Sequence, residues 1–460
     1  MKRILSVILV FSLLLCVFAG CGSQPAESES SSDDSSGAAV AQTLTAVIYD
    51  RGGDEEYWKA VIAAFEEANP GVTVDAYIGD NAAYVLRDNV LAGAAPDFVA
   101  LPSDEETGVT KALVLDKALL AIDDVERTAS TLLLSGAMQN AASRPYGDGA
   151  AYLAPLFFNV DGLIYNKTLL EEKGWSLPTT WEEFLALGET AKKEKVDLFA
   201  YAGEKQETLM PMFASAVAGS AGDEALDSLL RYTSDWSGDA VKAVFENVLG
   251  LSEYTADGSA GYDVDSLAAA FAKGDILFMP GDAETLASLR GEKLDEATSE
   301  SQDSEASSSE SEQAAEGAGD TTEYGFAAYP VLAAGDDSVA SISFTEMYIP
   351  YEADNADLAK KFMIFQYSDA AAKLAAEKTG EVTPVLKALD IAKAAGISGS
   401  RLDTYAILDK TVAAPVFMNV SAENETMSDE FLSAFAGLLA GNSKVDATVE
   451  KLNGLYQEMQ

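Results

Sequence analysis

The sequence contains no histidine and only two cysteines, and these absences exclude several kinds of site. Histidine is the commonest general base and metal ligand, so a serine–histidine triad and a histidine zinc site are impossible. Cys16 lies in an N-terminal segment that we expect to be removed, which leaves Cys21 alone. A lipidated Cys21 would leave no thiol for a disulfide, a metal or catalysis. We therefore expect no cofactor and no metal.

Positive charge is also scarce, since 30 Lys and Arg residues stand against 75 Asp and Glu residues. The formal net charge of -45 argues against a nucleic-acid partner and against an anionic membrane surface, because both would repel the chain. Part of the negative charge lies in two polar stretches, residues 27–34 and 292–323. The charge therefore indicates solubility more than it identifies a ligand.

Residues 1–21 have the features of a secretory signal: a basic start, an apolar run over residues 4–18 and small residues before Cys21. The apolar run is too short to favour a membrane span. Phe18-Ala19-Gly20-Cys21 resembles a bacterial lipoprotein signal, which implies lipidation of Cys21 and anchoring at the extracellular face of the cell membrane. Ordinary cleavage with an incidental Cys21 is the alternative. Residues 22–42 predict a flexible Ser/Glu/Asp tether.

From Thr43 the chain alternates short strands with helices, and 460 residues suit two domains of roughly 150 to 200 residues. The first expected elements are strands over 44–49, 72–78 and 98–101 and helices from residue 55 and over 82–91. This alternation predicts a mostly parallel sheet covered by helices, with ligands beyond the carboxyl ends of the strands. Helices are also expected over 113–122 and onward to 142.

Residues 156–165 predict a buried strand that polar residues interrupt. The interruptions are Asn159, Asp161 and Gly162, within a run otherwise suited to the interior of a sheet. Polar breaks of this kind can face a ligand.

The next segment predicts a short helix, a turn at Gly174 and a second helix that begins with a capping box of Thr180 and Glu183. This segment resembles the opening of the second lobe in extracellular solute-binding proteins of sugar ABC importers. The shared pattern is an aliphatic residue followed by Tyr-Asn-Lys, a helix, Gly and then Pro-x-Thr-Trp-x-Glu. Two segments resemble the first lobe of that family, FEEANPGVTV and LAGAAPDFVAL. A third resembles its second lobe, GYDVDSLAAAFAKGDILFMPGDAETL.

This resemblance to family 1, maltose-binding-protein-like solute-binding proteins implies a two-lobed periplasmic-binding-protein-like α/β fold. Each lobe would be a mixed sheet flanked by helices, and three chain segments, near residues 155, 341 and 383, would form the hinge. We expect the first lobe over 43–155 and 342–382 and the second over 156–341 and 383–460. Residues 292–322 predict a disordered acidic insertion in the second lobe.

The resemblance also implies a ligand cleft built from loops of both lobes. A neutral polyol needs groups that pair with its hydroxyls and an apolar face for its ring. The expected ligand contacts are Asp54, Glu55, Asp104, Phe158, Asn159, Glu207, Asp282, Phe344, Glu346 and Asn419. Other roles remain open for several of them: Asp54 and Glu55 suit a helix start, Asn159 a backbone cap and Asp282 a helix N-cap. Trp236 could stack on a sugar, but its pattern favours the core.

The predicted function is the binding component of an ABC importer, a monomer that delivers a sugar or oligosaccharide to the permease subunits by lobe closure. The first alternative keeps this fold but binds a polyamine or another non-sugar solute, for which an acidic cleft would be suitable. The second is an exported hydrolase that uses two carboxylates. No flanking motif singles out such a pair, so we expect no enzymatic activity.

Overall fold

The strands and helices below belong to a computed structural model in which all described residues form one unit, Ala41–Gln460. The structure describes residues 41–50, 54–102, 105, 107–134, 136–140, 142–292, 322–409, 411–415 and 425–459, without the side chains of 341, 343, 344, 412–415, 425 and 426. The predicted signal segment with Cys21, the tether up to residue 40 and residues 293–321 of the predicted insertion lie outside these ranges.

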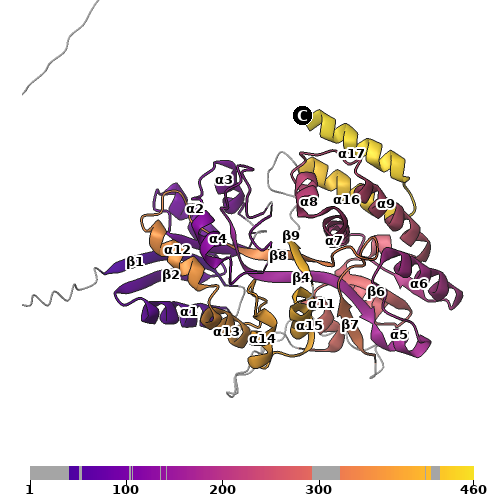
Figure 1. Cartoon of the computed structure of the whole chain (residues 1–460), viewed down its shortest axis with the longest axis horizontal. Helices are drawn as coiled ribbons and strands as arrows, with labels where there is room; N and C mark the ends of the chain where they lie inside the picture. Colours follow the sequence, from indigo (N-terminus) through magenta and orange to yellow (C-terminus); the bar gives the residue numbers. More distant parts are fainter. Residues whose placement is uncertain are drawn as a thin grey trace, which may run out of the picture. The chain divides into compact units, whose positions relative to one another are not determined.

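The strands join in one mixed sheet, with β7 and β9 attached off its main path (Figure 1). Along the main path the order is β2-β1-β3-β8-β4-β6-β5. The strands are β1 Gln42–Tyr49, β2 Val72–Gly79, β3 Phe98–Pro102, β4 Ala154–Asn166, β5 Asp197–Phe199, β6 Ile276–Gly281, β7 Tyr324–Ala327, β8 Val339–Tyr348 and β9 Val412–Pro415. β1 pairs in parallel with β2 and β3, whereas β8 is antiparallel to both β3 and β4. The expected mixed α/β fold is confirmed.

The long strand β4 connects two regions of the sheet. Its first half pairs with β8, and its second half pairs with β6 and β7 (Figure 1). At Phe158 a third segment joins them, because the Phe158 N–H donates to the Val382 carbonyl at 2.7 Å. The three predicted crossing segments therefore meet at one point. The assignment of residues to two lobes stays a prediction.

Helices lie between most of the strands along the chain. The α-helices are α1 Glu55–Ala68, α2 Ala82–Leu91, α3 Val109–Leu115, α4 Asp123–Ala129, α5 Lys167–Lys173, α6 Trp181–Lys193, α7 Met210–Ala221, α8 Asp223–Leu230, α9 Asp239–Leu251, α10 Val264–Phe271, α11 Ala283–Arg290, α12 Ala356–Phe365, α13 Asp369–Lys378, α14 Ala388–Ala394, α15 Gly399–Leu408, α16 Glu425–Leu439 and α17 Val445–Met459. Short 3-10 helices are η1 Gln206–Leu209, η2 Ser252–Tyr254 and η3 Ser259–Gly261.

The helix start at Thr180 follows directly from local sequence. The Thr180 hydroxyl accepts a hydrogen bond from the Glu183 N–H at 3.2 Å, and the Glu183 carboxylate accepts one from the Thr180 N–H at 3.3 Å. These bonds satisfy two amides that the first turn of α6 leaves without helical partners. The predicted capping box is confirmed.

The helix predicted over 113–122 is wrong beyond Leu115. Lys117 adopts a left-handed conformation with φ 54°, and Leu119 forms a β-bridge with Pro350. Between there and residue 142, the described residues form an α-helix at α4. Pairing with a segment more than 200 residues away therefore overrides the local helical pattern.

Two aromatic cores support the two ends of the sheet. The first core surrounds Phe98 and Phe362, whose ring centroids lie 5.0 Å apart. The second core surrounds Phe213, Trp236 and Phe431, and the rings of Trp236 and Phe431 stack at 5.0 Å. Trp236 is fully buried, so the prediction that it belongs to the core is confirmed.

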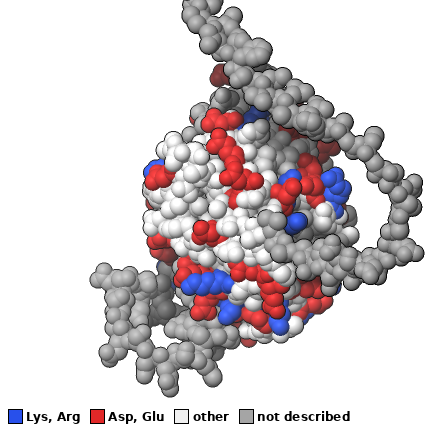
Figure 2. Space-filling view, turned by 90° about the vertical axis from the view of Figure 1, so that its left-hand side faces the viewer, with Lys and Arg blue, Asp and Glu red and all other residues white. Residues whose placement is uncertain are grey.

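Acidic side chains are spread over the face in Figure 2, and Lys and Arg lie beside some of them. An exposed ion pair joins Lys59 and Glu55 at 2.7 Å on the first turn of α1. Both side chains are more than half exposed, so the pair adds little to the free energy of unfolding. Negative charge on such surfaces favours solubility.

Candidate functional site

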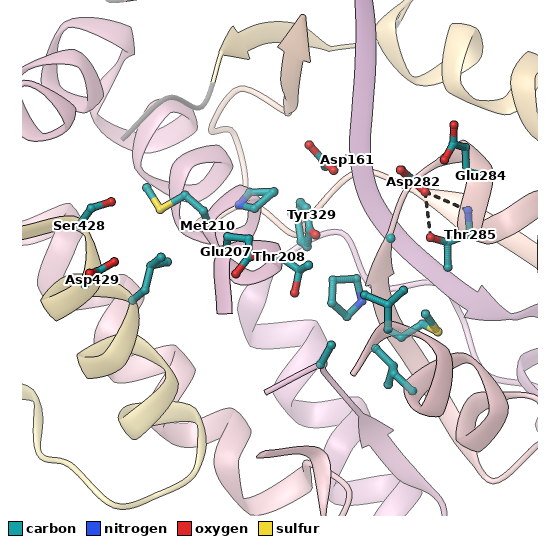
Figure 3. A pocket seen from close by; sticks show the side chains of 18 residues that line it. Asp161, Glu207, Thr208, Met210, Asp282, Glu284, Thr285, Tyr329, Ser428 and Asp429 are labelled. Carbon is teal, nitrogen blue, oxygen red and sulfur yellow. Dashed lines mark hydrogen bonds between the residues drawn. The ribbon is translucent and has the colours of Figure 1, made fainter. Parts of the chain in front are cut away.

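A cavity of about 720 Å³ opens where β4, β6, α7, α11 and α16 come together (Figure 3). Its lining combines carboxylates, hydroxyls and apolar groups: Asp161, Ala202, Glu207, Thr208, Met210, Pro211, Val264, Leu267, Met279, Pro280, Gly281, Asp282, Glu284, Thr285, Tyr329, Ser428, Asp429 and Leu432. Among these lining residues of the described chain there is no Lys and no Arg. We call this site the acidic cavity.

The alternation of side chains along β4 brings Asp161 to the cavity. Asn159 and Asp161 share one face of the strand, while Phe158 and Val160 share the other and are buried in the first core. Gly162 permits the close approach of β7, because a Cβ atom there would lie 2.5 Å from the Ala327 carbonyl oxygen. The polar break in the predicted strand thus has both a packing role and a place at the cavity.

Asp282 reaches the cavity from the end of β6. One of its carboxylate oxygens accepts hydrogen bonds from the N–H and the hydroxyl of Thr285 at 2.9 and 2.8 Å, which caps α11 (Figure 3). The other oxygen lies 3.5 Å from Nδ2 of Asn159. Asp282 is therefore both a helix cap, as its sequence context indicated, and a cavity residue.

Asp161 and Tyr329 give the cavity its unusual electrostatics. Burial and, secondarily, the Asp282 carboxylate raise the pKa of Asp161 to about 8. Tyr329 is 3% exposed, and its hydroxyl has no hydrogen-bond partner among the described residues. Burial, followed by the charges of Asp161 and Asp282, raises the pKa of Tyr329 well above its ordinary value. A buried hydroxyl without a partner is costly, so this group is poised for one.

Of the residues expected to bind a ligand, Glu207 and Asp282 line the cavity. Glu207 is exposed on η1, with one carboxylate oxygen 3.8 Å from Nζ of Lys205. Asn159 is exposed at the margin of the cavity beside Asp282. These three residues come together as the sequence predicted, and their contact with a ligand stays a prediction.

Asp54 and Glu55 lie elsewhere, at the start of α1. The Asp54 N–H donates to the Asp50 carboxylate at 2.9 Å, and the Asp54 side chain is buried at the helix start. Glu55 faces a separate groove between α1 and β2 and pairs with Lys59. Neither residue lines the acidic cavity.

The remaining expected ligand contacts are not among the cavity-lining residues, or they lie outside the described residues. Phe158 is 1% exposed within the first core, and Glu346 is 5% exposed on β8, opposite Leu101 and Pro155. Phe344 pairs with Phe158 across β8 and β4, but its side chain lies outside the described part of the chain. Asp104 and Asn419 lie outside the described residues altogether.

Several cavity residues were not among the expected contacts. Asp161 had a signal, because it interrupts the apolar run of β4. Tyr329 follows β7, and Ser428 and Asp429 come from α16, so their positions depend on packing between segments distant in sequence. No local motif marks these three residues.

Two further kinds of site can be considered within the described ranges. No group of three or more Asp, Glu, His or Cys side chains is placed there to hold a metal ion. None of the helices in those ranges combines the length and apolar character needed to cross a membrane. The cavity instead has acceptor oxygens and an apolar wall, a combination typical of sites for small polar solutes.

The mixed α/β fold is that of two-lobed periplasmic binding proteins. The bacterial solute receptor AcbH, which has an exclusive preference for β-D-galactopyranose, superposes with a TM-score of 0.68 at 16% identity, covering 91% of this chain and 98% of the receptor. The apo form of RafE from Streptococcus pneumoniae superposes with a TM-score of 0.65 at 18% identity, over 92% and 99% of the two chains.

Residues 51–373 match the model of the bacterial extracellular solute-binding protein family, and the chain belongs to this family. The multiple sugar-binding protein of Streptococcus mutans is 28% identical over 50% of this chain and 55% of its own. The diacetylchitobiose binding protein NgcE of Streptomyces coelicolor is 26% identical over 47% of each chain. The match thus spans about half the length of these curated relatives.

Proposed function

We propose that this protein is the solute-binding component of an ABC importer and that it binds a sugar or oligosaccharide without chemical change. The acidic cavity is the observation that carries this proposal. Its carboxylates and hydroxyls can pair with sugar hydroxyls, while Met210, Leu267 and Pro280 offer an apolar wall. The names of the relatives support the same class of solute, as does RafE, which forms a complex with raffinose.

The delivery step in this proposal is closure of two lobes around the solute, with the closed form recognised by permease subunits. The meeting of β4, β8 and the segment at Val382 supports a hinge of three strands. A solute that contacts both sides would stabilise the closed form over the open form.

The primary experiment is a thermal-shift screen of monosaccharides and oligosaccharides with the purified protein. A solute that binds only the folded state raises Tm by mass action. Hits would then be measured by calorimetry with Asn159→Ala, which we expect to weaken binding by about 1 to 3 kcal/mol while leaving Tm unchanged. A screen in which no saccharide raises Tm, followed by no detectable calorimetric binding, would count against the sugar class.

Closure has its own test in small-angle X-ray scattering. A saturating sugar should reduce the radius of gyration, because the cleft between the lobes narrows. An unchanged radius at a concentration where calorimetry shows saturation would refute closure, even if the sugar binds.

We also propose that Cys21 is lipidated and holds the protein at the extracellular face of the cell membrane, as a monomer. Several acyl chains on one residue anchor a protein where a single chain binds only marginally. The test is the membrane fraction of cells that express Cys21→Ser. We expect the variant in the soluble fraction, and its full retention in the membrane would refute this anchor.

A further inference from the structure

We propose that the acidic cavity recognises a protonated amine, so that the transported saccharide is an amino sugar with a free amino group. This inference rests on the proposed sugar-binding function and narrows its solute class. The cavity lining has five carboxylates, from Asp161, Glu207, Asp282, Glu284 and Asp429, and no cationic side chain among the described residues. An ammonium group brings three hydrogen-bond donors to such acceptor oxygens, whereas a hydroxyl brings one.

Asp161 and Asp282 lie near one another at the cavity (Figure 3). Asp282 is capped by Thr285 and has the Asn159 amide 3.5 Å away. Asp161 has no hydrogen-bond or ion-pair partner among the described residues, and the Asp282 charge acts on it unfavourably. Lys205 approaches Glu207 at 3.8 Å, but both side chains are mostly exposed. Within the described residues, neither Asp161 nor Asp282 therefore has an ion-pair partner.

The second observation is the hydroxyl of Tyr329. It is buried, has no partner in the described structure and lines the same cavity as Asp161 and Asp282 (Figure 3). The charges of both carboxylates act on it. An ammonium group has three donors and no acceptor, so it can donate to Asp161, to Asp282 and to the Tyr329 oxygen together. A ligand amine would thus give a partner to Asp161 and to the Tyr329 hydroxyl, which have none among the described residues, and a further donor to Asp282.

The described donor set favours an amine over a metal ion. No three of its carboxylates are placed to coordinate one cation, whereas an ammonium ion makes separate hydrogen bonds to acceptors farther apart. Met210, Leu267 and Pro280 leave an apolar wall for the ring that carries the amine. An amino sugar matches both parts of the lining.

A proton is released when such a ligand binds near neutral pH. The neighbouring charge that acts on Asp161 is that of Asp282, while Glu207, Glu284, Asp429 and Tyr329 also line the cavity. With a pKa of about 8, the Asp161 carboxyl is largely protonated at pH 7 before a ligand binds. The ammonium ion favours the carboxylate, so the proton leaves to solvent as the amine binds.

The test is calorimetry with matched saccharides that differ in one substituent: the β-1,4-linked disaccharides of glucosamine, N-acetylglucosamine and glucose, and the monosaccharide pairs glucosamine with glucose and galactosamine with galactose. We expect the free amines to bind at least tenfold more tightly than their acetylated or hydroxyl counterparts. Titrations at pH 7 in buffers of different ionisation enthalpy should show net proton release. Equal or tighter binding of a neutral member, or failure of every amine to bind, overturns the inference.

Spermidine separates this inference from the proposed function. If spermidine binds and no saccharide does, the amine site holds and the sugar function fails. If neutral saccharides bind and amines do not, the sugar function holds and the amine site fails.

Variants of cavity residues test whether the preference for amines arises in the acidic cavity. Asp161→Asn and Tyr329→Phe should each weaken amine binding at least fivefold and by more than they weaken the binding of any neutral sugar, with Tm equal to or above that of the parent protein. Glu450→Gln is the matched control, because it removes an exposed carboxylate from α17, away from the cavity. Equal loss of amine affinity in Glu450→Gln would indicate attraction by net charge and overturn the assignment to the cavity.

Discussion

The strand-to-helix junctions β1–α1 and β6–α11 carry the same kind of sequence signal but differ in structure. Each places acidic residues between a strand and a helix, at Asp54 and Glu55 in one and at Asp282 in the other. At β1–α1 the Asp54 N–H donates to the Asp50 carboxylate, and Glu55 pairs with Lys59. At β6–α11 the cap Asp282 also borders a cavity that β4 and α16 complete. A site thus depends on what the rest of the chain brings to a junction.

The largest expected effect tests the carboxylate of Asp161, which β4 brings to the cavity beside the second junction. Because folding raises the pKa of Asp161, the folded state binds more protons than the unfolded state between about pH 4 and pH 8. Its contribution to stability is present below the unfolded pKa and is lost as pH rises through the folded pKa. We therefore expect Asp161→Asn to gain stability relative to the parent protein, by about 2 to 5 kcal/mol between pH 4 and pH 8.

Denaturant unfolding across that pH range measures this difference. Glu55→Gln supplies the baseline, since it removes an exposed carboxylate at the other junction. A difference between Asp161→Asn and the parent protein that does not change with pH would show that Asp161 is not buried in this way.

The second prediction concerns the packing that holds β4 against β7. Gly162→Ala would place Cβ 2.5 Å from the Ala327 carbonyl oxygen, so one strand must move. We expect a loss of about 1 to 3 kcal/mol in the free energy of unfolding, together with weaker solute binding. Gly454→Ala is the control: its Cβ meets no atom within 4 Å, and it should stabilise α17 by about 0.5 to 1 kcal/mol. Equal stabilities for the two variants would contradict the close strand contact.

The third prediction compares the junctions as binding surfaces. Asp282→Asn keeps a helix cap but removes a charge from the cavity, and we expect about a tenfold loss of affinity, or ~1.4 kcal/mol. Glu55→Gln should lower affinity less, because Glu55 already pairs with Lys59. Calorimetry with one identified solute measures both. A larger loss for Glu55→Gln would move the principal site to the first junction.

The smallest expected effect is that of replacing residues 293–321 with a short linker. The chain on either side is held, since the Glu292 carboxylate accepts from the Ser400 N–H at 2.9 Å and Glu323 pairs with Lys167 at 2.7 Å. The composition of the removed segment offers little apolar surface to repay ordering. We expect Tm and solute affinity to stay nearly unchanged, and a large fall in Tm would refute the prediction.

Features set by neighbouring residues could be predicted from the sequence. The capping box of Thr180 and Glu183 involves groups three residues apart, and α2 spans residues 82–91 as predicted. The segment after Leu115 could not be predicted in this way, because its structure depends on the bridge from Leu119 to Pro350.

In the candidate site, too, residues marked by a local pattern could be predicted and residues placed by distant packing could not. Asp282 could be found as a cap after a buried strand, and Asp161 left a signal as a polar break. Tyr329 and Asp429 could not be found, because their places at the cavity arise from contacts between distant segments. The Tyr329 hydroxyl, which has no partner among the described residues, likewise owes its position to packing, which no local pattern encodes.

A crystal structure of the protein with its saturating solute tests the central claim most directly. The account predicts solute density in the acidic cavity, with a polar atom of the solute within hydrogen-bond distance of the Tyr329 hydroxyl and of the Asp161 or Asp282 carboxylate. Solute density at another site, with the Tyr329 hydroxyl still buried and without a partner, would contradict it.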